Sequence, residues 1–261
     1  MAIKGVIFDL GHTLMVLDST WPEVFERGAA DLAGFLAQER APVDAQAFAQ
    51  ALLDSRAEAF ARAKTTMREV TATETMLATF AQFGIAEPGG WLVAGAMESF
   101  FAYEDAQWQA EPDAIAVLSK LSDRGMRLGM FSNASDDSFI QHLVDRLGFR
   151  PWLDPALSSA GTGIRKPDPA ALEPFKEAWG LAAVELVVVG DRLEADILGA
   201  RRAGMCSVWL RARADARQED AAADQSPHAL KPKAIVEPDA SISRLADLPA
   251  CLSRLQMEDG P

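Results

Sequence analysis

The stretch LVVVGD (residues 186–191) places four apolar residues in a row before a glycine and a carboxylate. A short continuous apolar run of this kind is typical of a strand that is buried on both faces, as in a parallel sheet. The run GVIF (residues 5–8) has the same character and is followed by Asp9. Both stretches therefore predict central parallel strands that deliver an acidic side chain at their carboxyl ends.

Outward from residues 186–191, the chain after residue 110 alternates between strand and helix patterns. Strands are expected over residues 127–131, 155–159, 186–189, 206–210 and 234–236, with helices over 139–147, 170–179, 196–203 and 242–251. Residues 211–233 are polar and rich in Ala and Asp, which predicts a surface excursion. The alternation predicts the α/β class, with a doubly wound, Rossmann-like parallel sheet covered by helices on both faces.

Residues 17–109 have a different character, with long stretches rich in Ala, Glu, Gln, Arg and Leu. Helices are expected here over residues 22–38, 44–64, 73–83 and 91–103. We therefore predict two domains, a core of residues 1–16 and 110–261 and a small helical cap of residues 17–109. Arg68 and Glu69 fall in a helix connection of this cap, where a solvated loop is expected and contact with a substrate is the alternative.

Polar residues stand at four strand ends or in the loops beside them. They lie in the segments FDLGHTL (8–14), MFSN (130–133), GIRKPDP (163–169) and VGDRLEAD (189–196). In doubly wound sheets, ligands bind at the carboxyl ends of the strands. Carboxylates suit a hard cation such as Mg²⁺, an ammonium balances their charge, and hydroxyl and backbone N–H groups hold phosphate oxygens. The four segments together predict a phosphate and metal site.

These four motifs, in this order, resemble those of the haloacid dehalogenase-like (HAD) hydrolase superfamily, and residues 17–109 are similar to its alpha-helical cap. The resemblance implies that Asp9 is the nucleophile, which forms an aspartyl-phosphate. Ser132, with Asn133 beside it, would bind the transferred phosphoryl group. Lys166 would neutralise both Asp9 and the phosphate.

The resemblance also implies a Mg²⁺ cofactor. Asp9 and Asp191 would bind the metal directly, and the backbone carbonyl of Gly11 would be a further ligand. Asp196 would support the metal from the second shell or through a water molecule. Metal and lysine together would reduce the repulsion between the anionic nucleophile and the phosphate.

The chain departs from the family pattern directly after the nucleophile. The phosphatases of the family carry a second Asp two residues after the first, where it protonates the leaving alcohol and then activates water. This chain has Gly11 there, and His12 replaces the glycine that follows in the pattern. Loss of a positioned proton donor costs on the order of 10²–10⁴-fold in rate. His12 is a candidate replacement for that catalytic group, and filling space in the loop is its alternative role.

These observations predict a Mg²⁺-dependent hydrolase of small phosphorylated metabolites. One alternative is a relative of low or no activity that binds a phosphorylated ligand, and another is a dehalogenase or phosphonatase type of hydrolase. Gly11 favours both alternatives. Dehalogenases need no second Asp and no metal, so the retention of Asp191 and Asp196 favours phosphoryl chemistry.

Composition limits the partners. With 25 basic and 38 acidic side chains, the formal net charge is −13, which disfavours nucleic acid and anionic membrane surfaces. Charged residues interrupt every apolar run well before the length of a membrane span, and the first residues lack the apolar segment of a signal peptide. We therefore expect a cytoplasmic protein. The sequence leaves its oligomeric state undetermined.

Overall fold

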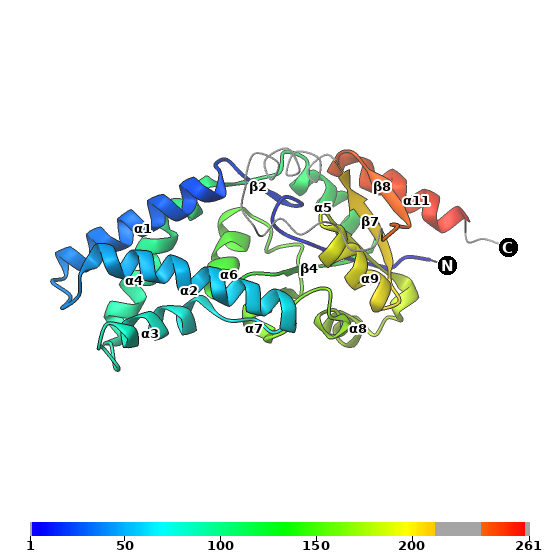
Figure 1. Ribbon diagram of the computed structural model, residues 1–261. Coiled ribbons are helices and arrows are strands. Elements are labelled where there is room, and N and C mark those ends of the chain that lie inside the picture. The colour runs from blue at the N-terminus through cyan, green and yellow to red at the C-terminus, as the bar shows by residue number, and fades with distance from the viewer. Residues whose placement is uncertain (1, 212–235, 259–261) are drawn as a thin grey trace.

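The computed structural model describes residues 2–211 and 236–258. Six parallel strands form one sheet in the order β5-β4-β1-β6-β7-β8. Figure 1 labels β4, β7 and β8 of this sheet. The strands are β1 (Gly5–Phe8), β4 (Arg127–Ser132), β5 (Ala156–Ser158), β6 (Leu186–Gly190), β7 (Cys206–Leu210) and β8 (Ala240–Ile242). Phe8, the last residue of β1, lies opposite both Met130 and Val189, so the carboxyl ends of the three central strands lie at the same edge of the sheet. The predicted fold class is confirmed.

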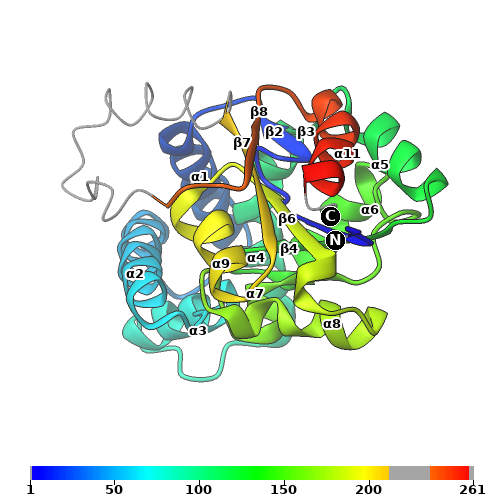
Figure 2. The ribbon, with the colours of Figure 1, turned by 90° about the vertical axis from the view of Figure 1, so that its right-hand side faces the viewer.

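Helices cover both faces of the sheet (Figure 2). They are α5 (Ala114–Asp123), α6 (Asp137–Arg146), α7 (Ser159–Thr162), α8 (Glu173–Trp179), α9 (Leu198–Arg202) and α11 (Leu248–Glu258). Val6 and Phe8 of β1 belong to the apolar cluster that includes residues of α5, α6 and α11, whereas Ile7 belongs to the cluster with α8 and α9. This division follows from the two-residue period of a strand, which sends neighbouring side chains to opposite faces.

Four further helices form the cap beside the sheet (Figure 1). They are α1 (Trp21–Gln38), α2 (Ala45–Thr66), α3 (Ala72–Gln82) and α4 (Gly90–Gln107). Their shared apolar cluster includes Leu32, Phe48, Phe80 and Phe100. The chain passes between cap and core through two antiparallel strands, β2 (Met15–Leu17) and β3 (Trp108–Ala110), which the sequence analysis did not predict. The predicted domain limits fall within this pair and stay a prediction.

The structure corrects the expected elements near the carboxyl end. The last strand is β8 and not residues 234–236, of which Val236 lies outside any strand and the other two lie outside the described residues. The final helix, expected over 242–251, begins only at Leu248, because Ile242 ends β8 and Pro249 suits the first turn of a helix. Apart from Arg211, the predicted excursion 211–233 lies outside the described residues.

Two other expected helices are interrupted at their starts. The helix expected over 170–179 is divided into a 3-10 turn (Pro169–Ala171) and α8, whose second residue, Pro174, cannot donate the N–H that would continue an earlier helical turn. The helix expected over 196–203 begins as a π-helical turn (Leu193–Ile197) before α9. None of the helices in the described part of the chain has the length and hydropathy of a membrane span.

Candidate active site

Three buried carboxylates meet at the carboxyl edge of the central strands. Asp9 directly follows β1, Asp191 directly follows β6, and Asp196 lies in the π-helical turn after it. One oxygen from each carboxylate lies within 4.8 Å of the others. Asp9, Asp191 and Asp196 are 8%, 3% and 0% exposed, so the charges are largely withdrawn from water. The structure thus brings together the three acids predicted from two segments, 8–14 and 189–196.

Lys166 supplies the positive charge inside this cluster. Its Nζ donates hydrogen bonds of 2.7 Å to Oδ1 of Asp9 and to the carbonyl of Phe131. It also lies 2.7 Å from Oδ1 of Asp196. Burial disfavours the ammonium, but the neighbouring Asp196 and Asp9 carboxylates outweigh it and raise the pKa of Lys166 above its ordinary value. The lysine is therefore charged at neutral pH.

Asn133 fixes the backbone of this lysine. The Lys166 N–H donates to Oδ1 of Asn133 at 2.9 Å, and Nδ2 of Asn133 donates to the Lys166 carbonyl at 2.8 Å. The amide of Asn133 thus closes a pair of hydrogen bonds across two loops that are distant in sequence. Ser132, the last residue of β4, is 7% exposed and lies beside this contact. The predicted roles of Ser132 and Asn133 toward a phosphate stay predictions.

The donor set fits a divalent cation. Asp9 and Asp196 share the Lys166 ammonium, and the charge of Arg192 acts on Asp191 and Asp196. Carboxylates this close repel one another unless a cation joins them. Burial raises the pKa of Asp196, and the negative charge of Asp9 raises it further. The ammonium of Lys166 opposes this shift. An all-oxygen set of this kind is what Mg²⁺ prefers. The Gly11 carbonyl remains a predicted ligand.

Gly190 makes room for Asp196. A Cβ atom at position 190 would lie 2.2 Å from Oδ2 of Asp196, a distance that no real contact allows. The same oxygen accepts a hydrogen bond of 3.0 Å from the N–H of Arg192. The glycine before Asp191 is therefore required by packing against the acid that follows in the π-helical turn.

The cap connection between α2 and α3 docks on the lysine loop. The guanidinium of Arg165 pairs with the carboxylate of Glu69, and these side chains are 8% and 3% exposed. Two backbone hydrogen bonds accompany the pair: Glu69 N–H to Gly163 O at 3.1 Å and Arg165 N–H to Met67 O at 3.0 Å. The expectation of a solvated loop is therefore wrong for Glu69. Its partner lies far away in sequence, so no local pattern indicated the contact.

Ser159 joins this connection to the loop after β4. Its hydroxyl accepts a hydrogen bond of 2.9 Å from the N–H of Ala134 and contacts the carboxylate of Glu69, to which it can donate. In the same region, the N–H of Ala72 donates to the carbonyl of Ser135 at 2.7 Å. The cap therefore contacts both loops that carry predicted phosphate-binding residues.

The position of the missing second Asp is bordered by an indole ring. A Cβ atom on Gly11 would lie 3.4 Å from Cη2 of Trp108, which is ordinary van der Waals contact. Trp108 is buried, and its Nε1 donates to Oε1 of Glu104 at 3.2 Å. Burial raises the pKa of the Glu104 carboxyl. No site role was predicted for either residue from the sequence.

His12 adopts a left-handed backbone conformation, with φ of 60°. This conformation suits glycine, which explains why a glycine is expected at this position in the family pattern. The His12 ring packs against Trp108 in an edge-on arrangement, with 5.4 Å between the ring centroids. Its catalytic role stays a prediction.

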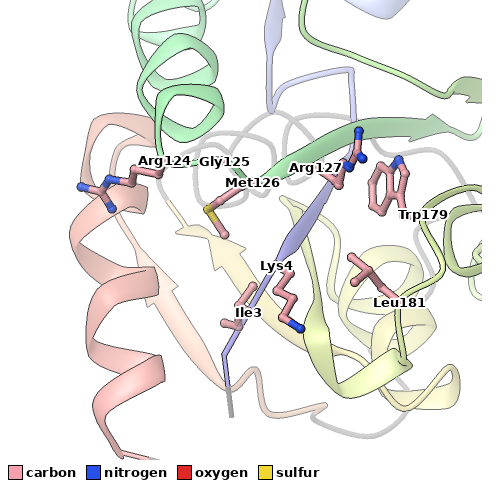
Figure 3. A pocket seen from close by; sticks show the side chains of 8 residues that line it. All are labelled: Ile3, Lys4, Arg124, Gly125, Met126, Arg127, Trp179 and Leu181. Carbon is pink, nitrogen blue, oxygen red and sulfur yellow. The ribbon is translucent and has the colours of Figure 1, made fainter.

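A hollow of about 720 Å³ lies between α3 and α4 of the cap and α6 of the core, with Leu77, Met97, Phe101, Asp136 and Phe139 among its lining residues. A smaller hollow of about 320 Å³ lies at the amino ends of β1 and β4, away from the carboxyl ends that carry the acidic cluster (Figure 3). Lys4, just before β1, and Arg127, at the start of β4, line this smaller hollow, and no carboxylate does. The smaller hollow is therefore separate from the acidic cluster.

Comparison with known proteins agrees with these motifs. The model of the haloacid dehalogenase-like hydrolase family matches residues 3–204. The glyceraldehyde 3-phosphate phosphatase of Methanopyrus kandleri is 33% identical over 126 residues, which are 48% of this chain and 54% of that protein. The phosphoserine phosphatase of Thermus thermophilus is 34% identical over 113 residues, 43% of this chain and 45% of that protein. The chain thus spans about half the length of these curated relatives.

Solved structures match over nearly the whole chain. A 2-haloacid dehalogenase from Pseudomonas syringae pv. Tomato DC3000 has a TM-score of 0.68 and 27% identity, covering 97% of this chain and 99% of that one. A HAD phosphatase from Thermococcus onnurineus has a TM-score of 0.59 and 19% identity, covering 95% of this chain and 97% of that one. The second likeness supports the fold alone.

Proposed function

The chain belongs to the haloacid dehalogenase-like hydrolase family, and on that premise we propose that it is a Mg²⁺-dependent hydrolase of small phosphate monoesters. The observation that carries this proposal is the buried cluster of Asp9, Asp191 and Asp196, in which Asp9 and Asp196 share the ammonium of Lys166. Curated relatives that act as phosphatases on phosphorylated metabolites support the same class of substrate.

In the proposed reaction, Asp9 attacks the phosphorus atom. The hydrogen bond from Lys166 engages Oδ1 of Asp9, which leaves Oδ2 for the attack. The new O–P bond forms as the ester O–P bond breaks, so the electron pair of that bond leaves with the alcohol oxygen. Water then attacks phosphorus and the O–P bond to Asp9 breaks, which restores the carboxylate and releases inorganic phosphate. The departing alkoxide takes a proton from solvent, and the attacking water returns one to the solvent.

The other site residues prepare this attack. Asp9, Asp191 and the Gly11 carbonyl would hold Mg²⁺, with Asp196 in support, and the bound cation would reduce repulsion between the nucleophile and the phosphate. The ammonium of Lys166 offsets the charge of the same two anions. Ser132 binds phosphate oxygens with its hydroxyl. The side-chain amide of Asn133 is engaged with Lys166, so its backbone N–H is the group left for the phosphate.

Gly11 limits which esters react quickly. No side chain at this position can protonate the departing oxygen, so leaving groups that depart as stable anions are favoured. The same feature supports a second candidate, a dehalogenase, because a halide leaves without a proton. The 27% identity to a solved 2-haloacid dehalogenase also favours this candidate, and the acidic cluster argues against it.

The test uses the purified full chain and 4-nitrophenyl phosphate, with Mg²⁺ or with EDTA. We expect turnover only with Mg²⁺ and a loss of at least about 10³-fold in Asp9→Asn, which keeps the size of the side chain and removes the nucleophile. Asp18→Asn is the matched control, since Asp18 is an exposed acid near the start of the cap. Chloride release from 2-chloropropionate without phosphate hydrolysis would support the dehalogenase. Binding of Mg²⁺ and phosphate without turnover of any ester would support the inactive relative.

A further inference from the structure

Arg56 occupies an apolar position of the cap helix α2. The buried residues on this helix include Leu52, Ala59 and Ala63, and Arg56 falls on the same stripe. Its guanidinium carbon lies 4.8 Å from the centroid of the Phe100 ring, and its Nε is buried without a hydrogen-bond partner. A cation therefore stands where the helical period places an apolar side chain.

No described residue forms an ion pair with this guanidinium. The acids whose charge acts on it are Glu104, Asp136 and Glu69. Each carboxylate is already hydrogen-bonded elsewhere, to the Trp108 indole, the Phe139 N–H and the Arg165 guanidinium respectively. Burial lowers the pKa of Arg56, and these acids oppose that shift without forming a direct bridge. The charge is thus only partly compensated within the described protein.

A charged group that is partly buried, with its Nε withdrawn from water and without a hydrogen-bond partner, is unfavourable, and stacking on aromatic rings offsets only part of the cost. An anion bound against the guanidinium would remove the remainder. Arginine offers two parallel N–H donors, which match the two oxygens of a carboxylate. The environment of Arg56 therefore has the properties of one half of an ion pair whose other half is a ligand.

Two neighbours of Arg56 connect it with the loops that carry the predicted phosphate site. Phe60, one helical turn further along α2, shares its face, and the Phe60 ring lies 5.5 Å from the guanidinium carbon of Arg165. Arg165 directly precedes Lys166. Asp136, which acts on Arg56, lies in the loop that follows Ser132. The charges that act on Arg56 therefore include Asp136, in the loop after β4, and Glu69, which docks on the loop that carries Lys166.

We propose that Arg56 determines specificity by binding a carboxylate at the end of the substrate away from the phosphate. The substrate class would be small phosphate monoesters of hydroxy acids. This inference rests on the proposed phosphatase function, to which it adds a second recognition point. Arg56 takes no part in the bond exchange, so its loss should affect the choice of substrate and leave the chemistry intact.

The test compares 3-phosphoglycerate with glycerol 3-phosphate, in which an uncharged hydroxymethyl group replaces the carboxylate. In Arg56→Gln, we expect the ratio of kcat/KM for these two esters to fall by about 10- to 100-fold, the effect of losing one charge-assisted hydrogen bond. Hydrolysis of 4-nitrophenyl phosphate should be unchanged. Arg62→Gln is the control, because Arg62 is exposed on the same helix. An unchanged ratio in Arg56→Gln would overturn the proposal.

Three further readouts distinguish recognition of a carboxylate by Arg56 from a structural role and from recognition of another anion. A structural role for Arg56 would lower the melting temperature of ligand-free Arg56→Gln, whereas removal of a poorly compensated charge should not, so a drop of several degrees would contradict the proposal. A different result would be that Arg56→Gln loses a preference for fructose 1,6-bisphosphate over fructose 6-phosphate while its kcat/KM ratio for 3-phosphoglycerate and glycerol 3-phosphate stays unchanged. That result would show that the proposed substrate class is wrong. If wild type turns over no ester, the phosphatase proposal fails. Calorimetric binding of 3-phosphoglycerate, weakened in Arg56→Gln and not in Arg62→Gln, would still support the arginine.

Discussion

Restoring a carboxylate with Gly11→Asp should raise the rate on alkyl phosphates far more than on aryl phosphates. An alkoxide is a strong base and needs a proton as it leaves, whereas 4-nitrophenolate is a weak base and leaves without one. The substituted residue stands two positions after Asp9, where the family pattern has its acid. The change therefore tests whether the absent side chain limits the present reaction.

The structure indicates that the new side chain fits. The Cβ atom would lie 3.4 Å from Cη2 of Trp108, and Gly11 is not among the glycines with a left-handed backbone. We therefore expect a loss of stability of about 1 kcal/mol or less. Desolvation by the indole would raise the pKa of the new carboxyl, which favours the protonated form that a general acid requires. A gain of about 10²–10⁴-fold is expected for the alkyl ester.

The assay is kcat/KM for glycerol 3-phosphate and 4-nitrophenyl phosphate at saturating Mg²⁺, with thermal melting as a check on folding. Gly11→Asn is the matched control, because it adds the same volume without a transferable proton. Equal gains on both esters, or the same gain in Gly11→Asn, would refute the reasoning. The same pair of esters tests His12: if its imidazole serves as the acid, His12→Asn should slow only the alkyl ester. Asn tolerates the φ of 60° found there.

Two other substitutions test the packing and the electrostatics. Gly190→Ala should displace Asp196, since the added Cβ would lie 2.2 Å from its Oδ2; we expect a loss of about 1–3 kcal/mol in stability and weaker Mg²⁺ binding by calorimetry. Gly34→Ala, where a Cβ meets nothing within 4 Å, should instead be neutral or stabilising. Burial raises the pKa of Glu104, so between the ordinary pKa and the raised one the folded state keeps a proton that the unfolded chain has lost. The free energy of unfolding therefore falls as pH rises through this interval. Glu104→Gln should therefore raise the melting temperature at pH 8 and have no such effect near pH 4; destabilisation at pH 8 would contradict this.

The strands of the central sheet were predictable because their signal is local. Residues 5–8 and 186–189 are continuous apolar runs, and each is followed by its acid within two residues. Once the strands are parallel neighbours, the topology itself brings Asp9 and Asp191 to the same edge. Most residues of the candidate site could therefore be predicted from the motifs and their order along the chain.

Contacts between distant segments were not predictable in this way. Glu69 and Arg165 are 96 positions apart, and neither is unusual in its own segment. The pair of strands β2 and β3 is only three residues on each side, too short for a period-2 pattern to show. Arg56 did leave a signal, because a charge interrupts the apolar stripe of its helix. That signal is readable only once the stripe is known to face the core of the cap.

Gly11 and His12 show how a loop can keep its shape while its chemistry changes. The His12 N–H donates to the carbonyl of Met15, and the N–H of Leu14 donates to the carbonyl of Leu10, so backbone groups close the turn. Neither bond depends on the side chain at position 11 or 12. Loss of the second acid therefore does not require the backbone that carries Asp9 to move. Metal binding and nucleophilic attack can thus persist in the proposed mechanism, while the step that needs a proton donor is the one that slows.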